Sequence, residues 1–361
     1  MSRPAKITID LAALQHNFLQ IKRFAPQSRV LAMVKSNAYG HGLQRIAAAM
    51  TDTDALGVAC LEEGLMLREA GIKKPIVLVE GLFKEDELVK AAQGNFSIVV
   101  HHPYQVEMLE KHNASNPLPV WLKINTGMYR LGFDPQDVEK YYMRLMNCSA
   151  VKKPIGLMTH FAESDSIDKT STLQQIEIFN HSTKNLVGPK SLSNSAGIIA
   201  WPAAHADWVR PGIMLYGASP FADHRGADHN LKPVMSLGSE LIAIHDAVKD
   251  SKVGYGGIWT CPEDMRIGVV GIGYGDGYPR HAQNGTPILV NGRLCPLIGR
   301  VAMDMLCIDL RTQPDAKIGD PVLLWGPGLP VEVIAEYSET IGYELLTRIT
   351  QRVHVVVSPD S

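Results

Sequence analysis

The sequence predicts an α/β chain in which a (β/α)₈ barrel precedes a second, all-β domain. Three observations lead to this prediction. Short apolar runs alternate with helical stretches over residues 1–232, which is the pattern of parallel βα units. Beyond the Lys232-Pro233 pair the helical periodicity ends, and glycine and proline separate short β-rich runs. The length of 361 residues also suits two domains better than one.

Eight apolar runs are the expected strands of the first domain. Eight such units within about 200 residues indicate a closed barrel, and an open doubly wound sheet is the alternative. The expected strands are residues 29–34, 55–59, 75–79, 97–100, 119–124, 155–159, 190–193 and 206–209. The expected helices between them include residues 62–70, 85–93, 104–111, 135–146 and 170–186.

The second expected domain covers residues 233–361, so that the first covers residues 1–232. Its glycine-rich segment, residues 271–277, lacks the GxGxxG spacing of dinucleotide sites because Asp276 stands where the third glycine would be. Its expected strands are residues 240–245, 266–271, 287–290, 305–310 and 321–324.

Composition narrows the class of protein. A net charge of −2 gives no electrostatic reason to expect binding to nucleic acid or to an anionic membrane. Residues 1–10 hold no apolar run of signal-peptide length, and no later run is long enough to span a bilayer. The five cysteines are scattered and lack CxxC spacing, which favours a reducing compartment and argues against a zinc site. We therefore expect a cytoplasmic protein without a metal.

Side chains that can take part in catalysis or in ligand binding follow several of the expected barrel strands. Active sites of barrels lie at these carboxyl-terminal ends of the strands. A lysine at such a position is often a solvated strand end, but it can also form an imine with an aldehyde. The loops after the seventh and eighth strands carry small residues suited to a phosphate. Together these features favour a phosphorylated aldehyde cofactor. In strand order the residues are Lys35, Lys123, Asn125, His160, Asn194, Ser195 and Arg210.

The segment 35–42 (Lys-Ser-Asn-Ala-Tyr-Gly-His-Gly) resembles the pyridoxal-phosphate lysine motif of the alanine racemase family. Further motifs of that family match in order along nearly the whole chain. They are residues 123–132, 158–162 and 210–217 in the first domain, and residues 253–256, 273–278, 303–305 and 342–344 in the second. The resemblance implies a pyridoxal-phosphate-dependent isomerase that interconverts L-alanine and D-alanine, with a barrel, a β domain and a homodimeric assembly.

The resemblance also assigns the catalytic residues. It implies that Lys35 carries the cofactor and acts as one base, while Tyr255 of the partner subunit is the base on the opposite face. His160 would lie beside that tyrosine, with Arg210 beyond it and facing the pyridine nitrogen. A guanidinium does not readily give up its proton, so the ring nitrogen would stay unprotonated.

The remaining assignments concern binding. The resemblance implies that Arg130 holds the substrate carboxylate or the oxygen of the cofactor ring, and that the Met303 backbone N–H helps to bind that carboxylate. It also implies that Tyr274 and Tyr343 narrow the entrance. It also implies a carbamylated Lys123, although Asn125 stands where the family pattern has aspartate. The implied phosphate ligands are Tyr39, Ser195, Gly212, Ile213 and Tyr343.

Three other functions remain open from the sequence. A barrel-type amino-acid decarboxylase would share the cofactor and the lysine, but its usual cysteine-centred substrate motif is not found. A racemase of broader specificity would share every motif named above. A barrel-type cofactor-binding protein without activity could lack the β domain, to which this chain gives about 129 residues.

Overall fold

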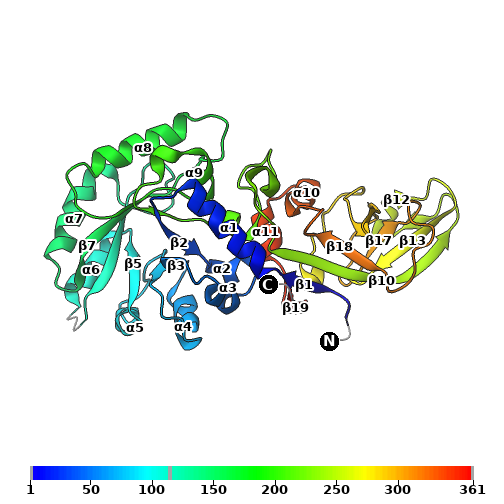
Figure 1. Cartoon of the computed structure of the whole chain (residues 1–361), viewed down its shortest axis with the longest axis horizontal. Helices are drawn as coiled ribbons and strands as arrows, with labels where there is room; N and C mark the ends of the chain where they lie inside the picture. The colour runs from blue at the N-terminus through cyan, green and yellow to red at the C-terminus, as the bar shows by residue number, and fades with distance from the viewer. Residues whose placement is uncertain (1–2, 113–115, 359–361) are drawn as a thin grey trace. The chain divides into compact units, whose positions relative to one another are not determined.

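The computed structural model describes residues 3–112 and 116–358 (Figure 1). The chain forms two compact units. One consists of Phe18–Leu215 and is called the barrel unit below. The other combines Met1–Asn17 with Tyr216–Ser361 and is called the β unit.

The barrel unit closes as predicted, because each expected strand pairs in parallel with the next and the last pairs with the first. The first and last strands pair in parallel and close the barrel, with Val30 opposite Val209. The fold class expected from the sequence is thus confirmed. The eight strands are β2 (Arg29–Met33), β3 (Ala55–Val58), β4 (Ile76–Leu78), β5 (Phe96–Val100), β6 (Leu118–Lys123), β7 (Val151–Met158), β8 (Lys190–Ser191) and β9 (Trp208–Val209).

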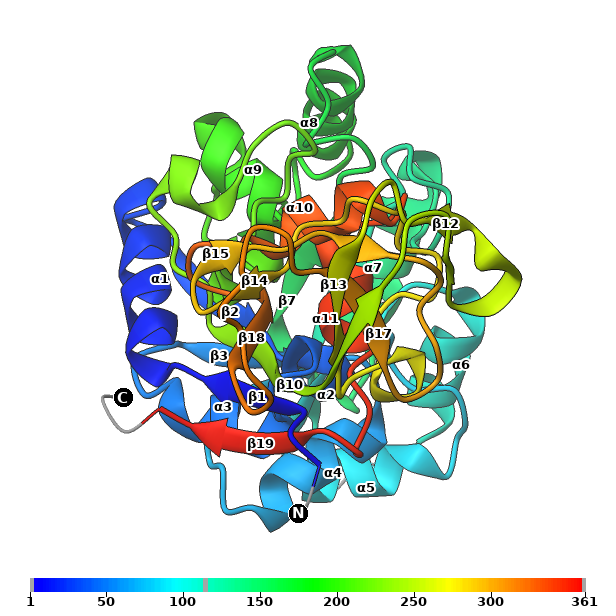
Figure 2. The ribbon, with the colours of Figure 1, turned by 90° about the vertical axis from the view of Figure 1, so that its right-hand side faces the viewer.

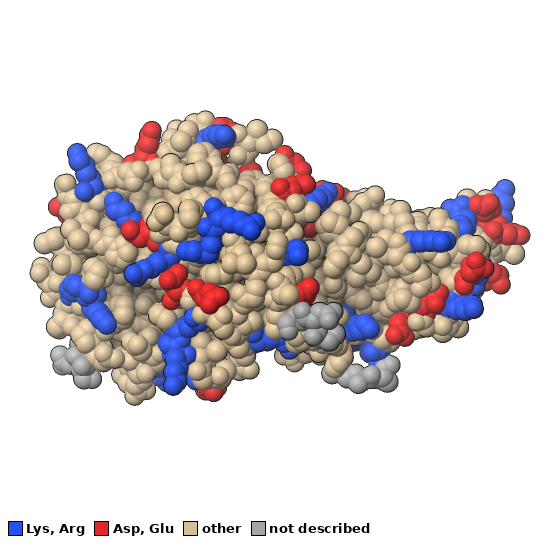
Figure 3. Space-filling view, in the orientation of Figure 1, with Lys and Arg blue, Asp and Glu red and all other residues tan. Residues whose placement is uncertain are grey.

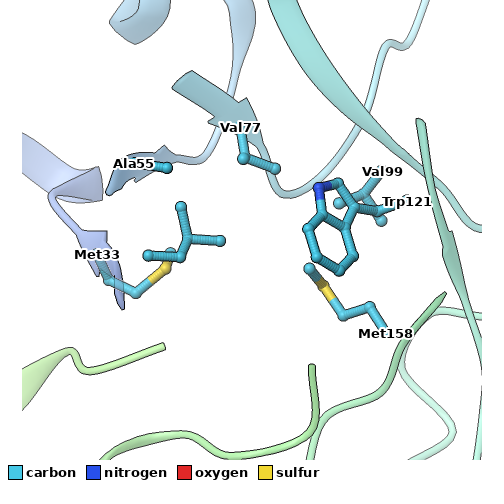
Figure 4. Close-up of a cluster of buried hydrophobic side chains, with 7 residues drawn as sticks. Met33, Ala55, Val77, Val99, Trp121 and Met158 are labelled. Atoms are coloured by element: carbon cyan, nitrogen blue, oxygen red, sulfur yellow. The ribbon is translucent and has the colours of Figure 1, made fainter. Parts of the chain in front are cut away.

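Side chains from alternate positions of these strands fill the barrel interior. Met33, Val77, Trp121 and Met158 point toward one another there (Figure 4). Trp121 needs a glycine opposite it, since a Cβ atom on Gly156 would lie 2.3 Å from its ring. The interior is therefore a packed core, and polar chemistry is left to the strand ends.

The helices of the barrel unit follow the predicted alternation with the strands (Figure 1). The expected helix over residues 170–186 is shorter in the structure, where it ends at Ser182. Helix α1 (Leu11–Phe24) crosses the boundary between the two units at Asn17 and Phe18. It begins after Asp10, whose carboxylate accepts a hydrogen bond from the Ala13 N–H at 2.8 Å. The others are α2 (Lys35–Tyr39), α3 (Leu43–Ala49), α4 (Leu61–Glu69), α5 (Glu87–Gln93), α6 (Pro103–Lys111), α7 (Val138–Asn147), α8 (Thr170–Ser182) and α9 (Ser195–Ala200).

The β unit is built on one long strand, β10 (Met235–Ala247), which pairs antiparallel with three others (Figure 2). Two short helices, α10 (Val331–Tyr337) and α11 (Gly342–Thr347), also occur in this unit and were not expected from its strand-rich texture. The remaining strands are β1 (Lys6–Ile9), β11 (Lys252–Val253), β12 (Trp259–Thr260), β13 (Met265–Val270), β14 (Leu289–Val290), β15 (Arg293–Leu294), β16 (Leu297–Ile298), β17 (Leu306–Asp309), β18 (Pro321–Trp325) and β19 (His354–Val357).

The compact units do not follow the expected division at residues 232 and 233. Strand β1, near the start of the chain, pairs antiparallel with β10 and parallel with β19, so the N-terminal segment belongs to the β unit. The segment from Tyr216 onward also belongs to this unit, where the Val234 N–H donates to the Tyr216 carbonyl. A domain boundary predicted from a change in the local sequence pattern misses such pairing, because strands that pair in a sheet need not be neighbours in sequence.

The surface carries no single-sign field on the face shown in Figure 3, where lysine and arginine are interspersed with aspartate and glutamate. This mixture agrees with the near-zero net charge. Among residues 3–112 and 116–358, no helix is both long and apolar enough to cross a membrane.

A buried carboxylate in the β unit contacts one arginine near each end of the chain. Asp276 is fully buried and lies 2.7 Å from an Arg3 nitrogen and 3.3 Å from Arg352 Nε. Its Oδ2 also accepts a hydrogen bond from the Gly273 N–H at 3.0 Å. Asp304 extends the network through a 2.6 Å ion pair with Arg352, but this carboxylate is 43% exposed.

We expect Asp276→Asn to lower the free energy of unfolding by about 3 kcal/mol, because it removes the buried charge that two arginines contact. Urea unfolding at fixed protein concentration measures this loss. Asp304→Asn is the matched control and should cost at most about 1 kcal/mol, since solvent screens its exposed pair. Equal losses in the two variants would contradict the account of Asp276.

Candidate active site

The predicted strand-end residues of the barrel unit come together at its carboxyl-terminal mouth. Lys35 follows β2, Lys123 ends β6, His160 follows β7 and Arg210 follows β9. Burial lowers the pKa of Lys123, and the charges of Arg210, Arg130 and Lys35 lower it further, which reflects their proximity. Four basic side chains thus lie close enough to interact electrostatically, a concentration suited to anionic ligands.

Lys35 opens a strained segment of backbone. The next four residues, none of them glycine, have φ values of 55°, 53°, 52° and 52°, so the short helix α2 is left-handed. Each such residue costs about 1–2 kcal/mol relative to a right-handed one. The strained residues are Ser36, Asn37, Ala38 and Tyr39. Strain of this kind persists only where surrounding contacts enforce it.

Local hydrogen bonds account for part of that enforcement. The Asn37 side chain accepts from the Leu43 N–H at 2.8 Å, and the Ala38 N–H donates to the Val34 carbonyl at 2.8 Å. His41 is buried, and its Nδ1 lies 2.9 Å from the Tyr39 carbonyl oxygen. Burial lowers the pKa of His41 to about 4, so at neutral pH the ring is uncharged. The conformation of Tyr39 is thereby fixed by its own motif.

The loops after β2, β8 and β9 meet at Tyr39, Ser195, Gly212 and Ile213, which are called the cradle below. The Ser195 Oγ accepts a hydrogen bond from the Gly212 N–H at 2.9 Å, and both Ser195 and Ile213 are buried. A Cβ atom on Gly212 would lie 2.4 Å from the Tyr39 hydroxyl, so only glycine leaves room for that hydroxyl. Burial raises the pKa of Tyr39 to about 12, which keeps its hydroxyl protonated as a donor.

Hydroxyls and backbone N–H groups around a glycine make a fitting environment for a phosphate. The cradle lies at the loops after the last two strands, where barrels commonly bind phosphate. The barrel-unit residues therefore fit the phosphate of the cofactor that the motifs imply.

Arg210 is buried and bound on several sides. Its guanidinium donates to Ser191 Oγ at 2.6 Å, to the Thr159 carbonyl at 2.5 Å and to the Leu192 carbonyl at 3.1 Å. Burial lowers its pKa to about 10, so it stays charged at neutral pH. These neutral partners fix the position of the charge without cancelling it. It could not be recognised from the sequence that Ser191 and the Thr159 carbonyl are partners of this arginine.

Arg210 also orients His160. One guanidinium nitrogen lies 3.3 Å from His160 Nδ1. Arginine can only donate, so Nδ1 is the acceptor and the proton of the neutral ring resides on Nε2. Burial and the nearby cations, Arg210 first, hold the pKa of His160 well below its usual range. The ring is therefore a neutral Nε2–H donor.

Gln175, on helix α8, supports the loop that carries His160. Its amide nitrogen donates to the His160 carbonyl at 3.1 Å, and its amide oxygen accepts from the Ala162 N–H at 2.9 Å. This contact of Gln175 could not be recognised from the sequence. The only signal for it is a polar side chain on the buried face of a predicted helix, which many proteins show without such a role.

Lys123 is buried, and its pKa is lowered to about 7 by burial and by the nearby Arg210, Arg130 and Lys35. Asn125, the departure from the family pattern, accepts hydrogen bonds from the Tyr129 N–H at 3.0 Å and the Gly127 N–H at 3.3 Å. An aspartate oxygen could accept the same bonds. Asn125 thus shapes the turn that leads to the exposed Arg130, without adding a negative charge.

The other predicted site residues lie in the β unit. Tyr255 is 70% exposed in a turn between two glycines of positive φ, Gly254 and Gly256. Tyr274 and Met303 lie on adjoining segments, because the Tyr274 N–H donates to the Ala302 carbonyl and the Gly275 N–H donates to the Met303 carbonyl. Tyr343 is half-buried near the start of α11. The unit thus presents several large side chains at its surface.

Comparison with known proteins identifies the family. A family model described as "Alanine racemase, N-terminal domain" matches residues 9–220, and one described as "Alanine racemase, C-terminal domain" matches residues 234–357. The "Alanine racemase" of Coxiella burnetii is 53% identical over 357 residues, with 98% of each chain covered. The "Alanine racemase, biosynthetic" of Escherichia coli (strain K12) is 49% identical over 350 residues, covering 97% of this chain and 98% of that protein.

Solved structures agree with these relatives. The biosynthetic alanine racemase of Pseudomonas aeruginosa superposes with a TM-score of 0.96 at 45% identity, and 99% of each chain is covered. The alanine racemase of Acinetobacter baumannii gives a TM-score of 0.94 at 43% identity, covering 99% of this chain and 100% of that one. The family and enzyme class expected from the motifs are confirmed: the chain belongs to the alanine racemase family.

Proposed function

We propose that this chain interconverts L-alanine and D-alanine with pyridoxal 5'-phosphate, using Lys35 and the partner subunit's Tyr255 as bases on opposite faces of the substrate. The observation that carries the proposal is the cluster of Lys35, Lys123, Arg130 and Arg210 beside the phosphate-fitting cradle. Such a site suits two anionic groups at once, the phosphate of a cofactor and the carboxylate of an amino acid.

The cofactor, when bound, withdraws electron density from the substrate α-carbon and so makes its hydrogen removable. Lys35 would hold the aldehyde carbon. Arg210, charged and fixed by neutral partners, would face the ring nitrogen without handing it a proton. The phosphate ligands would be Tyr39, Ser195, Gly212 and Ile213 of the barrel unit, together with Tyr343.

Inversion of the α-carbon requires a proton to leave one face and another to arrive on the opposite face. A single base on one face tends to return the proton to the same side, so two bases are needed. Lys35 supplies one, and the exposed hydroxyl of the partner's Tyr255 supplies the other. A free phenol has a pKa of about 10 and needs help to ionise at neutral pH. The Nε2–H of His160, backed by the charge of Arg210, is a suitable donor to the phenol oxygen.

Substrate selection follows from the remaining residues. Arg130 and the backbone N–H of Met303 would bind the carboxylate, while Tyr274 and Tyr343 would limit the room for the side chain. This arrangement favours alanine over larger amino acids. It also requires a homodimer with two shared sites, since the two bases come from different subunits. The five cysteines are all free, in line with the cytoplasmic location that we propose.

Lys123 is expected to react with carbon dioxide. A neutral amine is the reactive form, and a pKa of about 7 leaves much of it neutral at pH 8. Carbamylation would also replace one cation of the cluster by an anion, which turns repulsion with Arg130 and Arg210 into attraction. We expect a carbamate signal in ¹³C NMR with labelled bicarbonate, growing as pH rises through 7. Lys123→Arg should lack it, and a signal equal in the wild-type protein and in this variant would contradict the assignment.

The direct test of function is an assay of the purified protein with L-alanine and added cofactor. Chiral chromatography should show D-alanine approaching an equal mixture, with no release of carbon dioxide. Carbon dioxide without D-alanine would indicate the decarboxylase alternative, and no turnover would indicate a binding protein. Serine and larger amino acids in the same assay separate an alanine-selective enzyme from a racemase of broader specificity.

A further inference from the structure

Glu63, in the first turn of α4, connects the loop that begins at Lys35 to the neighbouring strand-end loop. One carboxylate oxygen accepts a hydrogen bond from the Ser36 N–H at 2.7 Å. The other accepts from the Ala59 N–H at 2.8 Å. Ser36 directly follows Lys35 and is the first of the four left-handed residues. Glu63 is therefore bonded to the backbone at the point where the strained turn starts.

The placement of Glu63 follows from the local sequence. Helix α4 begins at Leu61, after Cys60, which makes no side-chain capping hydrogen bond. A glutamate at the third position of a helix reaches back to the backbone just before the helix, as in a capping box. Its second oxygen is then directed at the adjacent loop, because β2 and β3 are neighbouring parallel strands with Met33 opposite Gly57.

This bridge also extends the pairing of the two strands beyond their ends. The Val34 N–H donates to the Gly57 carbonyl at 2.8 Å, immediately after β2. Beyond that bond, the carboxylate of Glu63 connects the Ser36 N–H of one loop to the Ala59 N–H of the other. Hydrogen bonds to a charged acceptor are stronger than those between neutral groups. Glu63 thus resists relaxation of the left-handed turn into an ordinary one.

We infer that Glu63 is a positioning residue for Lys35, holding the strained turn so that the lysine amine meets the cofactor. The inference rests on the proposed function, because it takes Lys35 as the residue that holds the cofactor aldehyde. Glu63 touches neither substrate nor cofactor in this account and acts only through the backbone at Ser36. The competing view is that Glu63 simply caps α4.

A matched set of variants separates these views. Glu63→Ala removes both hydrogen bonds, and Glu63→Gln keeps only one acceptor oxygen. Glu62→Ala is the control, because Glu62 is an exposed glutamate in the same helical turn. Hydrogen–deuterium exchange of the cofactor-free proteins comes first. In Glu63→Ala, the peptide that covers residues 35–42 should exchange about tenfold faster, while peptides of α4 beyond its first turn should keep the wild-type rate.

The second measurement is an absorbance titration with pyridoxal 5'-phosphate. Glu63→Ala should bind it about tenfold more weakly or worse, Glu63→Gln should fall between, and Glu62→Ala should match the wild type. In kinetic assays at saturating cofactor, kcat for alanine should fall in the same order while KM stays nearly constant, because the carboxylate-binding residues are untouched.

Two results would overturn the inference. One is unchanged exchange of residues 35–42 and unchanged cofactor affinity in Glu63→Ala. The other is faster exchange throughout α4 with a matching loss of thermal stability, which would make Glu63 a helix cap only. If the wild-type protein neither binds the cofactor nor racemises alanine, the proposed function fails. The exchange measurement on cofactor-free protein still decides whether Glu63 holds the turn.

Discussion

Replacing Lys35 with alanine should lower the rate of alanine racemisation at least about a thousandfold, because one change removes a base and the group that holds the cofactor. Lys35 lies at the head of the strained turn, among Lys123, Arg210 and Arg130. The barrel should still fold, since its interior is filled by other side chains. Initial rates in both directions measure the loss, and circular dichroism checks the fold.

Chemical trapping distinguishes a direct role of Lys35 from an indirect one. Borohydride should attach the cofactor permanently to the wild-type peptide that contains Lys35, and mass spectrometry should find it there. Lys84→Ala, which alters an exposed lysine, should retain activity and the label on Lys35. Label on a different lysine of the wild-type protein would exclude Lys35 as the attachment point.

Changing Tyr255 to phenylalanine should lower racemisation about a hundredfold to ten-thousandfold, because a positioned base is lost while the ring remains. The side chain is 70% exposed and flanked by glycines, so its hydroxyl is not needed for packing. Lys35 remains in this variant and should still exchange the α-hydrogen on its own face. In deuterated water we therefore expect one enantiomer of alanine to acquire deuterium without inversion, as seen by NMR and chiral chromatography.

Tyr337→Phe is the control for this experiment. Tyr337 is also in the β unit and is 38% exposed, but no motif assigns it a role. It should racemise at the wild-type rate. Deuterium entering both enantiomers of alanine equally in Tyr255→Phe would mean that this tyrosine is not the second base.

The sequence predicted the barrel well because its strands are short apolar runs with polar ends. Even β8 and β9, two residues each, were predicted from their place in the alternation. The helices α10 and α11 were missed because seven and six residues give too little periodicity to recognise. The membership of β1 in the β unit depends on pairing with residues more than two hundred positions away, for which local sequence has no signal.

In the candidate site, too, residues within a local motif could be predicted, whereas residues that act through contacts with other segments could not. Lys35, His160 and Arg210 could be found because each follows an expected strand and lies within a recognisable motif. Glu63 and Gln175 could not, because they act through backbone groups of other segments, Ser36 and His160 respectively. The left-handed turn was also unexpected, since Asn37 and its neighbours are not glycine and are held in this conformation by local hydrogen bonds and by Glu63.

The most direct test of the central proposal, a site shared between two subunits, combines two inactive proteins. Lys35→Ala and Tyr255→Phe chains are mixed in equal amounts, dissociated, reassembled and supplied with cofactor. In a mixed dimer one site then carries both changes and the other carries neither. Random pairing makes about half of the dimers mixed, so activity should recover to roughly a quarter of the wild-type level. No recovery, with mixed dimers shown by differently tagged chains, would place both bases in one subunit and contradict the shared site.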